Sequence, residues 1–520
     1  MNSTLHMSAE SGFKFALLAT LAIKLVLAYI LPMSGDEAYF IVWAQHLDFG
    51  YYDHPPMVGW ILHVLLYLGN SEVLLRLPAI LLATAIGYGI YRLLKPLDEI
   101  KAALIATLFL ISPINLLNVL IVTDTPLILF VFLSVASLYQ ALQKNPLQKN
   151  HRLWYVLSGI FLGLAFLSKY FSALLILGYL GYFIWAYFIF SKKSKPEPKP
   201  KIQGLFLLLL AALPFALLNL YWNYTHCWDN ILFNLYNRNE GEKASLGKVA
   251  IFLATQLYLM TPPIAYYLFK NRAELRQKLR NNGFELFAFA LLLPMAIFTL
   301  LSLKKIIGLH WVLAFYPFFY LLLYQLLSRD ELQRSLKFMV WFSAAHLLVI
   351  VIIAFLPLEI WKQNKLYNGM VFMFHNDAIV EKIRPYEQQN FLLAADGYTP
   401  AAIASYHYGR NFFVFGEGSH HARQDDIITD FRQFQGRNIL ILKKTAPDLM
   451  QYIPYFQSVE SKQFDLHGTT LYLVLGYNFD YENYKEQVLM QIKKKYYAIP
   501  EYLPHAPCYF CEKYFPKEVI

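Results

Sequence analysis

Long apolar runs follow one another through the first two thirds of the chain. A membrane-spanning helix needs roughly 20 mainly apolar residues, and eleven candidate runs lie at about 13–33, 72–91, 102–121, 125–142, 153–168, 171–190, 202–219, 249–268, 284–302, 312–327 and 338–357. The first run lacks a small-residue cleavage site and is predicted to be a retained helix. The pattern predicts a polytopic α-helical membrane domain over residues 1–357, with about 11–13 spans. The eighth and tenth runs are the weaker ones, and kinked or re-entrant segments would change that count.

The pattern changes after Pro357, where polar and apolar residues mix. Short strands are predicted at Phe391–Ala395, Phe412–Phe415, Asn438–Leu442 and Thr470–Leu475, and helices at 399–408 and 481–494. We therefore expect residues 358–520 to form a soluble α/β domain.

Lysine and arginine are distributed unevenly between the loops. The loops at 92–101, 143–152, 191–201, 269–281 and 328–337 hold 19 basic residues, whereas the alternate loops hold 6. Cytoplasmic loops carry the excess of basic residues, so the first set is predicted to be cytoplasmic. With eleven spans and a cytoplasmic N-terminus, residues 358–520 then lie on the outer side.

Composition supports a membrane protein. The chain of 520 residues is 57% hydrophobic and 15% charged, whereas soluble domains carry about 25% charged residues. The net charge of +10 sits in short clusters between apolar runs, as topology signals do, which argues against a nucleic-acid partner.

The first outer loop is long, aromatic and acidic. It contains Asp36 and Glu37, followed by Tyr52-Asp53-His54-Pro55-Pro56. Trp43 and Trp60 favour an amphipathic helix in the membrane interface, which would bring a lipid head group to fixed carboxylates. Asp36 and Glu37 point about 100° apart in a helix, so one of them is expected to cap the helix N-terminus. The Asp53–Pro56 segment is equally compatible with a rigid turn.

Further charged residues are predicted on the same side. Asp124 follows Thr123 at the start of the fourth run, where either residue suits a helix cap. Four cationic or titratable positions are Lys169, Arg238, Lys304 and His310. Their alternative role is snorkelling to the interface. Because basic residues are depleted on this face, they also suit phosphate at the water–lipid boundary.

Three cysteines are present, at 227, 508 and 511. A local Cys508–Cys511 disulfide is plausible outside the cytoplasm. A zinc site at this pair would lack a fourth ligand.

These loops resemble those of the GT-C glycosyltransferases. Gly35-Asp36-Glu37-Ala38-Tyr39, Arg76-Leu77-Pro78, Thr123-Asp124-Thr125-Pro126, Ser168-Lys169-Tyr170 and His310-Trp311-Val312 occur in the order of that family. Within it, the chain is similar to the dolichyl-phosphate-mannose protein mannosyltransferase-like group, near the bacterial aminoarabinose–lipid A transferases. Asp53-His54 stands where those transferases carry Glu-Lys, so a titratable ring replaces a fixed cation.

The resemblance implies an inverting glycosyltransferase of the bacterial inner membrane, with its active site facing the periplasm. It implies a polyprenyl-phosphate sugar donor and an envelope acceptor, lipid A or another glycolipid, with a protein acceptor as the alternative. Asp36, Glu37 and Asp124 are the expected catalytic residues. Lys169, Arg238, Lys304 and His310 are expected to bind the donor phosphate, and Tyr52, Asp53 and His54 to position the acceptor or the loop. No cofactor is required, and the need for a divalent metal stays open. A lipid-linked sugar flippase would share the apolar body and stays open as another class.

Overall fold

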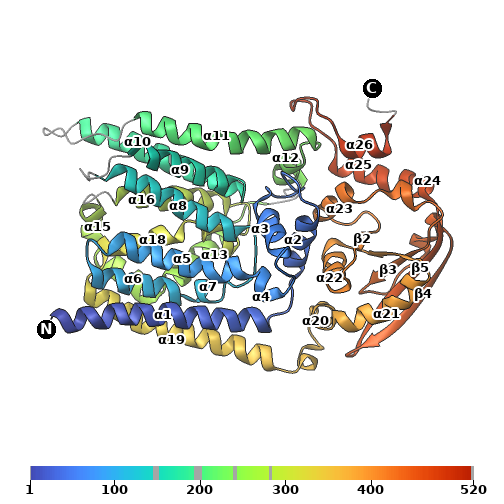
Figure 1. Cartoon of the computed structure of the whole chain (residues 1–520), viewed down its shortest axis with the longest axis horizontal. Helices are drawn as coiled ribbons and strands as arrows, with labels where there is room; N and C mark the ends of the chain where they lie inside the picture. Colours follow the sequence, from blue (N-terminus) through green and yellow to red (C-terminus); the bar gives the residue numbers. More distant parts are fainter. Residues whose placement is uncertain (1, 144–150, 192–201, 238–242, 280–283, 517–520) are drawn as a thin grey trace. The chain divides into compact units, whose positions relative to one another are not determined.

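The computed structural model describes residues 2–143, 151–191, 202–237, 243–279 and 284–516 (Figure 1). The chain divides into two compact units that do not follow a single cut in the sequence. Unit 1 consists of Met1–Ile30, Ser71–Leu218 and Gly241–Ile353, and unit 2 of Leu31–Asn70, Asn219–Glu240 and Ala354–Ile520. Residues 358–520 therefore fold together with two segments from the first half of the chain, and their independence as a domain stays a prediction.

Unit 1 is helical. Its helices are α1 (Asn2–Ile30), α4 (Glu72–Leu75), α5 (Leu77–Leu94), α6 (Glu99–Ile111), α7 (Pro113–Leu116), α8 (Asp124–Leu142), α9 (His151–Phe166), η1 (Tyr170–Ser172), α10 (Ala173–Ser191), most of α11 (Ile202–Thr225), α13 (Leu246–Met260), α14 (Pro262–Lys270), α15 (Arg272–Leu279), α16 (Glu285–Leu301), α17 (Leu309–Val312), α18 (Tyr316–Leu326) and α19 (Arg329–Phe355). Each predicted run contains a helix. By length and apolarity, six of the described helices are long enough to cross a membrane, and three more are shorter and apolar.

Two of the predicted spans are broken, each at a proline. The run at 102–121 ends as a helix at Ile111, because Ser112 precedes Pro113 and adopts an extended ψ of 137°. The run at 249–268 bends by 95° between α13 and α14. There Thr261 has a φ of +67° and is followed by Pro262. The eighth run, one of the two weaker ones in the sequence, is thus a bent pair of helices.

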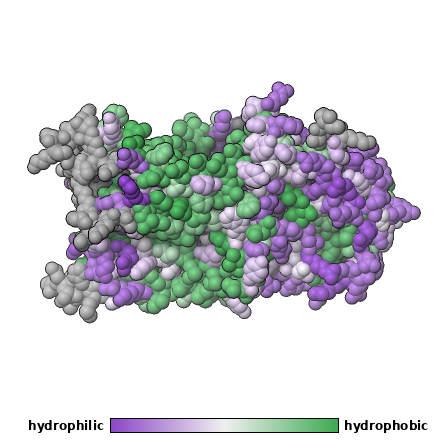
Figure 2. Space-filling view, turned by 45° about the horizontal axis from the view of Figure 1, so that its top comes forward, coloured by the Kyte–Doolittle hydropathy of each residue, from purple (hydrophilic) through white to green (hydrophobic). Residues whose placement is uncertain are grey.

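Two buried cationic side chains tie α1 to α5 within unit 1. The Arg76 guanidinium donates to the Ala28 carbonyl at 2.7 Å and pairs with Glu72 at 3.2 Å. Lys24 donates to the Ala79 carbonyl at 2.8 Å. Charge far from water needs such partners. Large apolar side chains elsewhere face outward, including Trp341 of α19 at 78% exposure, and apolar residues cover much of the helical surface in Figure 2. This is the pattern of a lipid-facing surface.

Unit 2 contains a five-stranded sheet in the order β2-β1-β3-β5-β4. Its strands are β1 (Leu392–Ala395), β2 (Phe413–Val414), β3 (Ile439–Lys443), β4 (Phe456–Leu466) and β5 (Thr469–Phe479). The first three are parallel, and β5 and β4 continue the sheet antiparallel. The helices are α2 (Gly35–Gln45), α3 (Met57–Leu66), α12 (Asp229–Leu232), η2 (Phe233–Asn237), η3 (Leu358–Trp361), α20 (Tyr367–Phe374), α21 (Asn376–Gln388), α22 (Tyr398–Tyr408), η4 (His420–Ala422), α23 (Arg423–Ile428), η5 (Phe431–Phe434), η6 (Leu449–Gln451), η7 (Ile453–Tyr455), α24 (Tyr481–Tyr484), η8 (Lys485–Leu489), α25 (Met490–Tyr496) and α26 (Tyr509–Tyr514).

A disulfide joins two of the three segments of unit 2. It links Cys227 to Cys508, which are 281 residues apart. The expected Cys508–Cys511 disulfide is therefore wrong, since Cys508 pairs with the distant cysteine and Cys511 is outside the bond. The Cys227 amide also donates to the Pro507 carbonyl at 3.2 Å. The 219–240 segment is thus fixed to the C-terminal region both covalently and through its backbone.

Candidate active site

Asp36 and Glu37 lie in the first turn of α2 and differ in their environment. Ser34 is the N-cap, and its hydroxyl accepts from the Glu37 amide at 3.3 Å. The Glu37 carboxylate accepts in return from the Ser34 amide at 3.1 Å and from its hydroxyl at 3.0 Å. Glu37 is thus a buried capping residue. Asp36 is exposed on the same turn and is the one of the two that a substrate can reach.

The helix α2 does not have the exposed face expected of an amphipathic helix, because it is enclosed on nearly every side. Its depth in the membrane stays a prediction. Residues Glu37 to Ala44 are all buried, and Trp43 is fully so. The Trp43 ring stacks on Tyr51 with a centroid distance of 4.6 Å. On another face Tyr39 packs against Tyr398 of α22 at 5.1 Å. The aromatic residues of this loop therefore serve mainly as the core that holds α2.

Asp53 lies between two histidines. It is 5% exposed, and its Oδ2 is 3.4 Å from Nδ1 of His54 and 3.3 Å from Nδ1 of His421. Burial by itself would raise the pKa of Asp53, but the two rings outweigh it and hold that pKa well below its usual range. Asp53 is therefore a buried carboxylate whose charge is stabilised by imidazoles, one of them from the C-terminal segment. The rigid-turn interpretation of Asp53–Pro56 does not account for these contacts.

The backbone before Asp53 is held by two amide side chains. Asn230 donates to the carbonyls of Tyr51 and Tyr52, the latter at 2.8 Å. The Tyr52 amide donates to the Gln424 side chain at 2.7 Å. Tyr52 itself is fully buried, so it positions the loop by packing. Sequence reasoning missed Asn230, His421 and Gln424, because single polar residues in irregular segments give no periodic signal.

Asp124 and Lys169 are brought together in unit 1. The Lys169 ammonium is 2.7 Å from Oδ2 of Asp124, and the two side chains are 12% and 4% exposed. Lys169 also lies 5.4 Å from the centre of the Phe171 ring. Oδ1 of Asp124 has no hydrogen-bond partner among the described residues. The capping interpretation is not supported: Thr123 takes the N-cap position without a side-chain bond, and Asp124 serves as the partner of a buried cation.

The remaining predicted phosphate ligands are less defined. Lys304 and His310 of unit 1 are exposed. Arg238 lies outside the described residues. Within the described part of the chain, no cluster of three or more His, Cys, Asp or Glu residues is arranged to hold a metal ion.

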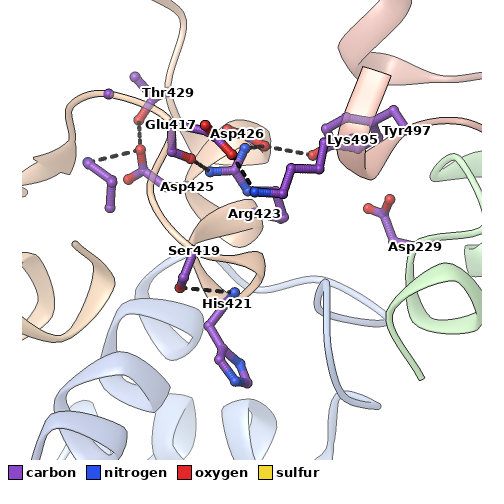
Figure 3. A network of polar contacts seen from close by, with 12 residues as sticks. Asp229, Glu417, Ser419, His421, Arg423, Asp425, Asp426, Thr429, Lys495 and Tyr497 are labelled. Atoms are coloured by element: carbon purple, nitrogen blue, oxygen red, sulfur yellow. Dashed lines mark hydrogen bonds and ion pairs between the residues drawn. The ribbon is translucent and has the colours of Figure 1, made fainter. Parts of the chain in front are cut away.

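A second polar network lies deeper in unit 2 (Figure 3). Arg423 pairs with Asp426 at 3.1 Å, and Asp426 accepts from the Tyr497 hydroxyl at 2.8 Å. Tyr497 meets Tyr509, which donates to Asp229 at 3.0 Å. Burial raises the pKa of Asp229 well above its usual range. The network connects the 219–240 segment to the C-terminal region beside the disulfide and has a structural role.

Three comparisons with known proteins bear on this arrangement. Residues 53–222 match the family model described as dolichyl-phosphate-mannose-protein mannosyltransferase. The structure of ArnT from Cupriavidus metallidurans in the apo state is similar to this one, with a TM-score of 0.62 and 16% sequence identity. The match covers 90% of this chain and 98% of the ArnT chain. The chain has the GT-C glycosyltransferase fold. The GT-C recognition from the outer-loop motifs is thereby confirmed, as is the expected combination of apolar helices with a C-terminal α/β sheet.

Two further matches have names that state a ligand or an activity. The structure of the same ArnT bound to undecaprenyl phosphate has a TM-score of 0.62 and 15% sequence identity to this chain. The match covers 88% of this chain and 97% of the ArnT chain. The lipid A galacturonosyltransferase RgtD from Rhizobium johnstonii is 24% identical over 261 residues, which are 47% of this chain. This chain spans about half of the length of RgtD, 51%.

Proposed function

We propose that this protein is a membrane glycosyltransferase that transfers a sugar from a polyprenyl-phosphate donor to an envelope glycolipid, with inversion at the anomeric carbon. The buried Asp124–Lys169 pair is the observation that carries the proposal. An ammonium group at the end of an apolar helix is stabilised by nearby anions, and a donor phosphate would share that role with Asp124. The names of the relatives support the substrates: one structure holds undecaprenyl phosphate, and one curated relative acts on lipid A.

Lys169 would stabilise the departing polyprenyl phosphate. The ammonium has three N–H donors, and Asp124 occupies one direction at 2.7 Å. The others remain for phosphate oxygens as the glycosidic bond breaks and negative charge develops on the leaving group. Arg238, Lys304 and His310 would add positive charge there. The leaving group then needs no metal ion.

Asp36 would act on the acceptor. With a hydroxyl acceptor, its carboxylate removes the proton as the sugar is transferred. With a phosphate acceptor such as that of lipid A, the nucleophile is already anionic, and Asp36 orients it or stabilises positive charge on the sugar. Its exposure on the first turn of α2 suits either role, and the bonded Glu37 beside it suits neither.

The site is proposed to face the periplasm. The three sequence segments that form unit 2 are those that the distribution of basic residues assigns to the outer side. They also contain the Cys227–Cys508 disulfide, and disulfides persist in oxidising compartments such as the periplasm. Two independent lines therefore support the same orientation in a bacterial inner membrane.

The deciding experiment uses purified protein in proteoliposomes with radiolabelled undecaprenyl-phosphate sugars and extracted envelope lipids. We expect label on a glycolipid with wild type and none with Asp36→Asn at normal expression. Mass spectrometry of envelope lipids from cells with and without the protein identifies the product. Label that changes leaflet without leaving its carrier would reject the transferase and favour a flippase.

A protein acceptor is the second candidate, favoured by the name of the matching family model. The same assay separates the two, because label would then be sensitive to protease and insoluble in organic solvent.

A further inference from the structure

His421 connects the C-terminal segment of unit 2 to the loop that follows α2. We propose that His421 is a positioning residue for the proposed transfer: it holds Asp53, which in turn orients His54 toward substrate. The inference rests on the proposed function. It assigns a role in the reaction to the C-terminal segment.

The first argument is the shared oxygen. Both rings approach Oδ2 of Asp53 through Nδ1, at 3.4 Å from His54 and 3.3 Å from His421. His421 makes a hydrogen bond to this oxygen, whereas His54 contacts it at ion-pair distance without a hydrogen bond. Asp53 therefore holds the His54 ring by charge, from a position that His421 fixes. The His54 side chain is 19% exposed, which leaves part of the ring accessible. Such a carboxylate–imidazole pair can accept a proton from a hydroxyl or donate one to a phosphate oxygen.

The second argument is that one histidine cannot hold Asp53 alone. Asp53 is 5% exposed, and its Oδ1 has no hydrogen-bond partner among the described residues. A buried carboxylate with one oxygen uncompensated is costly. The His421 Nδ1–H is the hydrogen bond that keeps Oδ2 occupied. Without it, Asp53 would rotate toward water or take up a proton, and His54 would lose its fixed orientation.

The third argument is that His421 is itself fixed. The Tyr39 hydroxyl donates to its carbonyl at 2.8 Å, and its amide donates to the Ser419 hydroxyl at 3.3 Å. The ring lies 5.4 Å from Tyr398 and 5.2 Å from Phe233. Figure 3 shows the side chain extending away from the Arg423 cluster. A histidine held through its backbone and packed against two aromatic rings is placed as a rigid support.

Substitutions at 421 and 53 test the role. His421→Ala should lower kcat about 10-fold, since misplacing a catalytic group by about 1 Å costs up to 10²-fold, with less than 3-fold change in the donor KM. His421→Asn should recover most of the rate, because its amide N–H replaces Nδ1–H toward Asp53. In an Asp53→Asn background, His421→Ala should add less than 2-fold, because the two act through one contact.

The matched control is His407→Ala. His407 pairs with Asp377 at 3.0 Å in the same unit, so it removes a histidine–carboxylate contact that does not touch the loop. Its kcat should equal that of wild type. The melting temperature of every variant is measured alongside.

Three outcomes overturn the inference. A His421→Ala enzyme with wild-type kcat contradicts it while leaving the proposed function intact. Equal loss in His421→Ala and His421→Asn, each with a lowered melting temperature, shows a purely structural role. Absence of sugar transfer by wild type removes the proposed function and this inference with it.

Discussion

At the scale of single residues, two adjacent carboxylates have different tasks. Glu37 closes a capping box, whereas Asp36 is exposed on the same turn. The sequence contains the signal that separates them, since Ser34 and Glu37 have the spacing of a capping box. It does not show which side chain reaches a substrate, because reach depends on packing against residues hundreds of positions away.

The capping role predicts a loss of stability in Glu37→Gln. Ser34 donates both of its bonds to one oxygen of Glu37, so the amide oxygen of glutamine can accept them, but the charge at the helix N-terminus is lost. The free energy of unfolding should therefore fall by about 1 kcal/mol. Thermal unfolding of the purified variant measures this, and kcat should stay within about 3-fold of wild type. A loss of activity as complete as that of Asp36→Asn would contradict the division of roles.

The Asp124–Lys169 pair predicts asymmetric effects on donor use. Lys169→Ala should raise the donor KM about 10-fold, because a charge-assisted bond to phosphate contributes about 1.5 kcal/mol or more. Asp124→Asn leaves the Lys169 cation in place and should raise the donor KM less. Initial rates at varied donor and fixed acceptor separate the two. An unchanged donor KM in Lys169→Ala would count against phosphate binding.

Asp425 predicts a pH-dependent stability. Burial raises its pKa to about 7, above the unfolded value of about 3.9. Its neutral form therefore stabilises the fold below about pH 4, and this contribution is lost as the pH rises through 7. Asp425→Asn should match wild type near pH 4 and exceed its unfolding free energy by on the order of 2 kcal/mol at pH 8. Melting curves at both pH values measure the difference, and equal gains at both would refute this explanation.

At the scale of elements, α2 is set by its close approach to α22. A Cβ at Gly35 would lie 2.3 Å from Cγ2 of Thr399, so a side chain there pushes the helix that carries Asp36 away from its support. Gly35→Ala should therefore lower kcat about 10-fold.

A second substitution makes this prediction specific. Thr399→Ser removes the clashing methyl group and should restore most of the activity in the double variant. Gly369→Ala is the control, because nothing lies within 4 Å of its added Cβ. Steady-state kinetics of the four proteins measure the effect. A Gly35→Ala enzyme that Thr399→Ser does not rescue would contradict the steric explanation.

The elements themselves were largely predictable. Every apolar run yielded a helix, and four of the five strands were expected from their β-branched and aromatic residues. The missed strand, β4, is an edge strand with mostly exposed side chains, so it lacks an apolar face to detect. The breaks in the apolar runs at Pro113 and Pro262 interrupt the hydropathy pattern too little to be predicted from it. Contacts such as Asp53 with His421 depend on long-range folding and are invisible to local patterns.

At the scale of the whole molecule, the disulfide is the covalent connection between distant parts of unit 2. Cys227→Ser should lower the stability of unit 2 by about 2–5 kcal/mol. It should also reduce transfer, because Asn230 beside it holds the Tyr51–Tyr52 backbone. Wild type treated with a reductant should show the same losses of stability and transfer as Cys227→Ser. Cys511→Ser should not show them, because Cys511 is outside the disulfide. Thermal unfolding and transfer assays with and without dithiothreitol check this. Full stability of the reduced protein would refute it.

The division of unit 2 among three distant segments has a consequence for biogenesis. A ribosome delivers Asp53 to the membrane long before His421, and Cys227 long before Cys508. The nascent chain therefore holds residues 31–70 without their later supports while the following helices are still being inserted. We expect the protein to become competent only after residue 508 has been translocated and oxidised, so that premature termination leaves an inserted but inert chain.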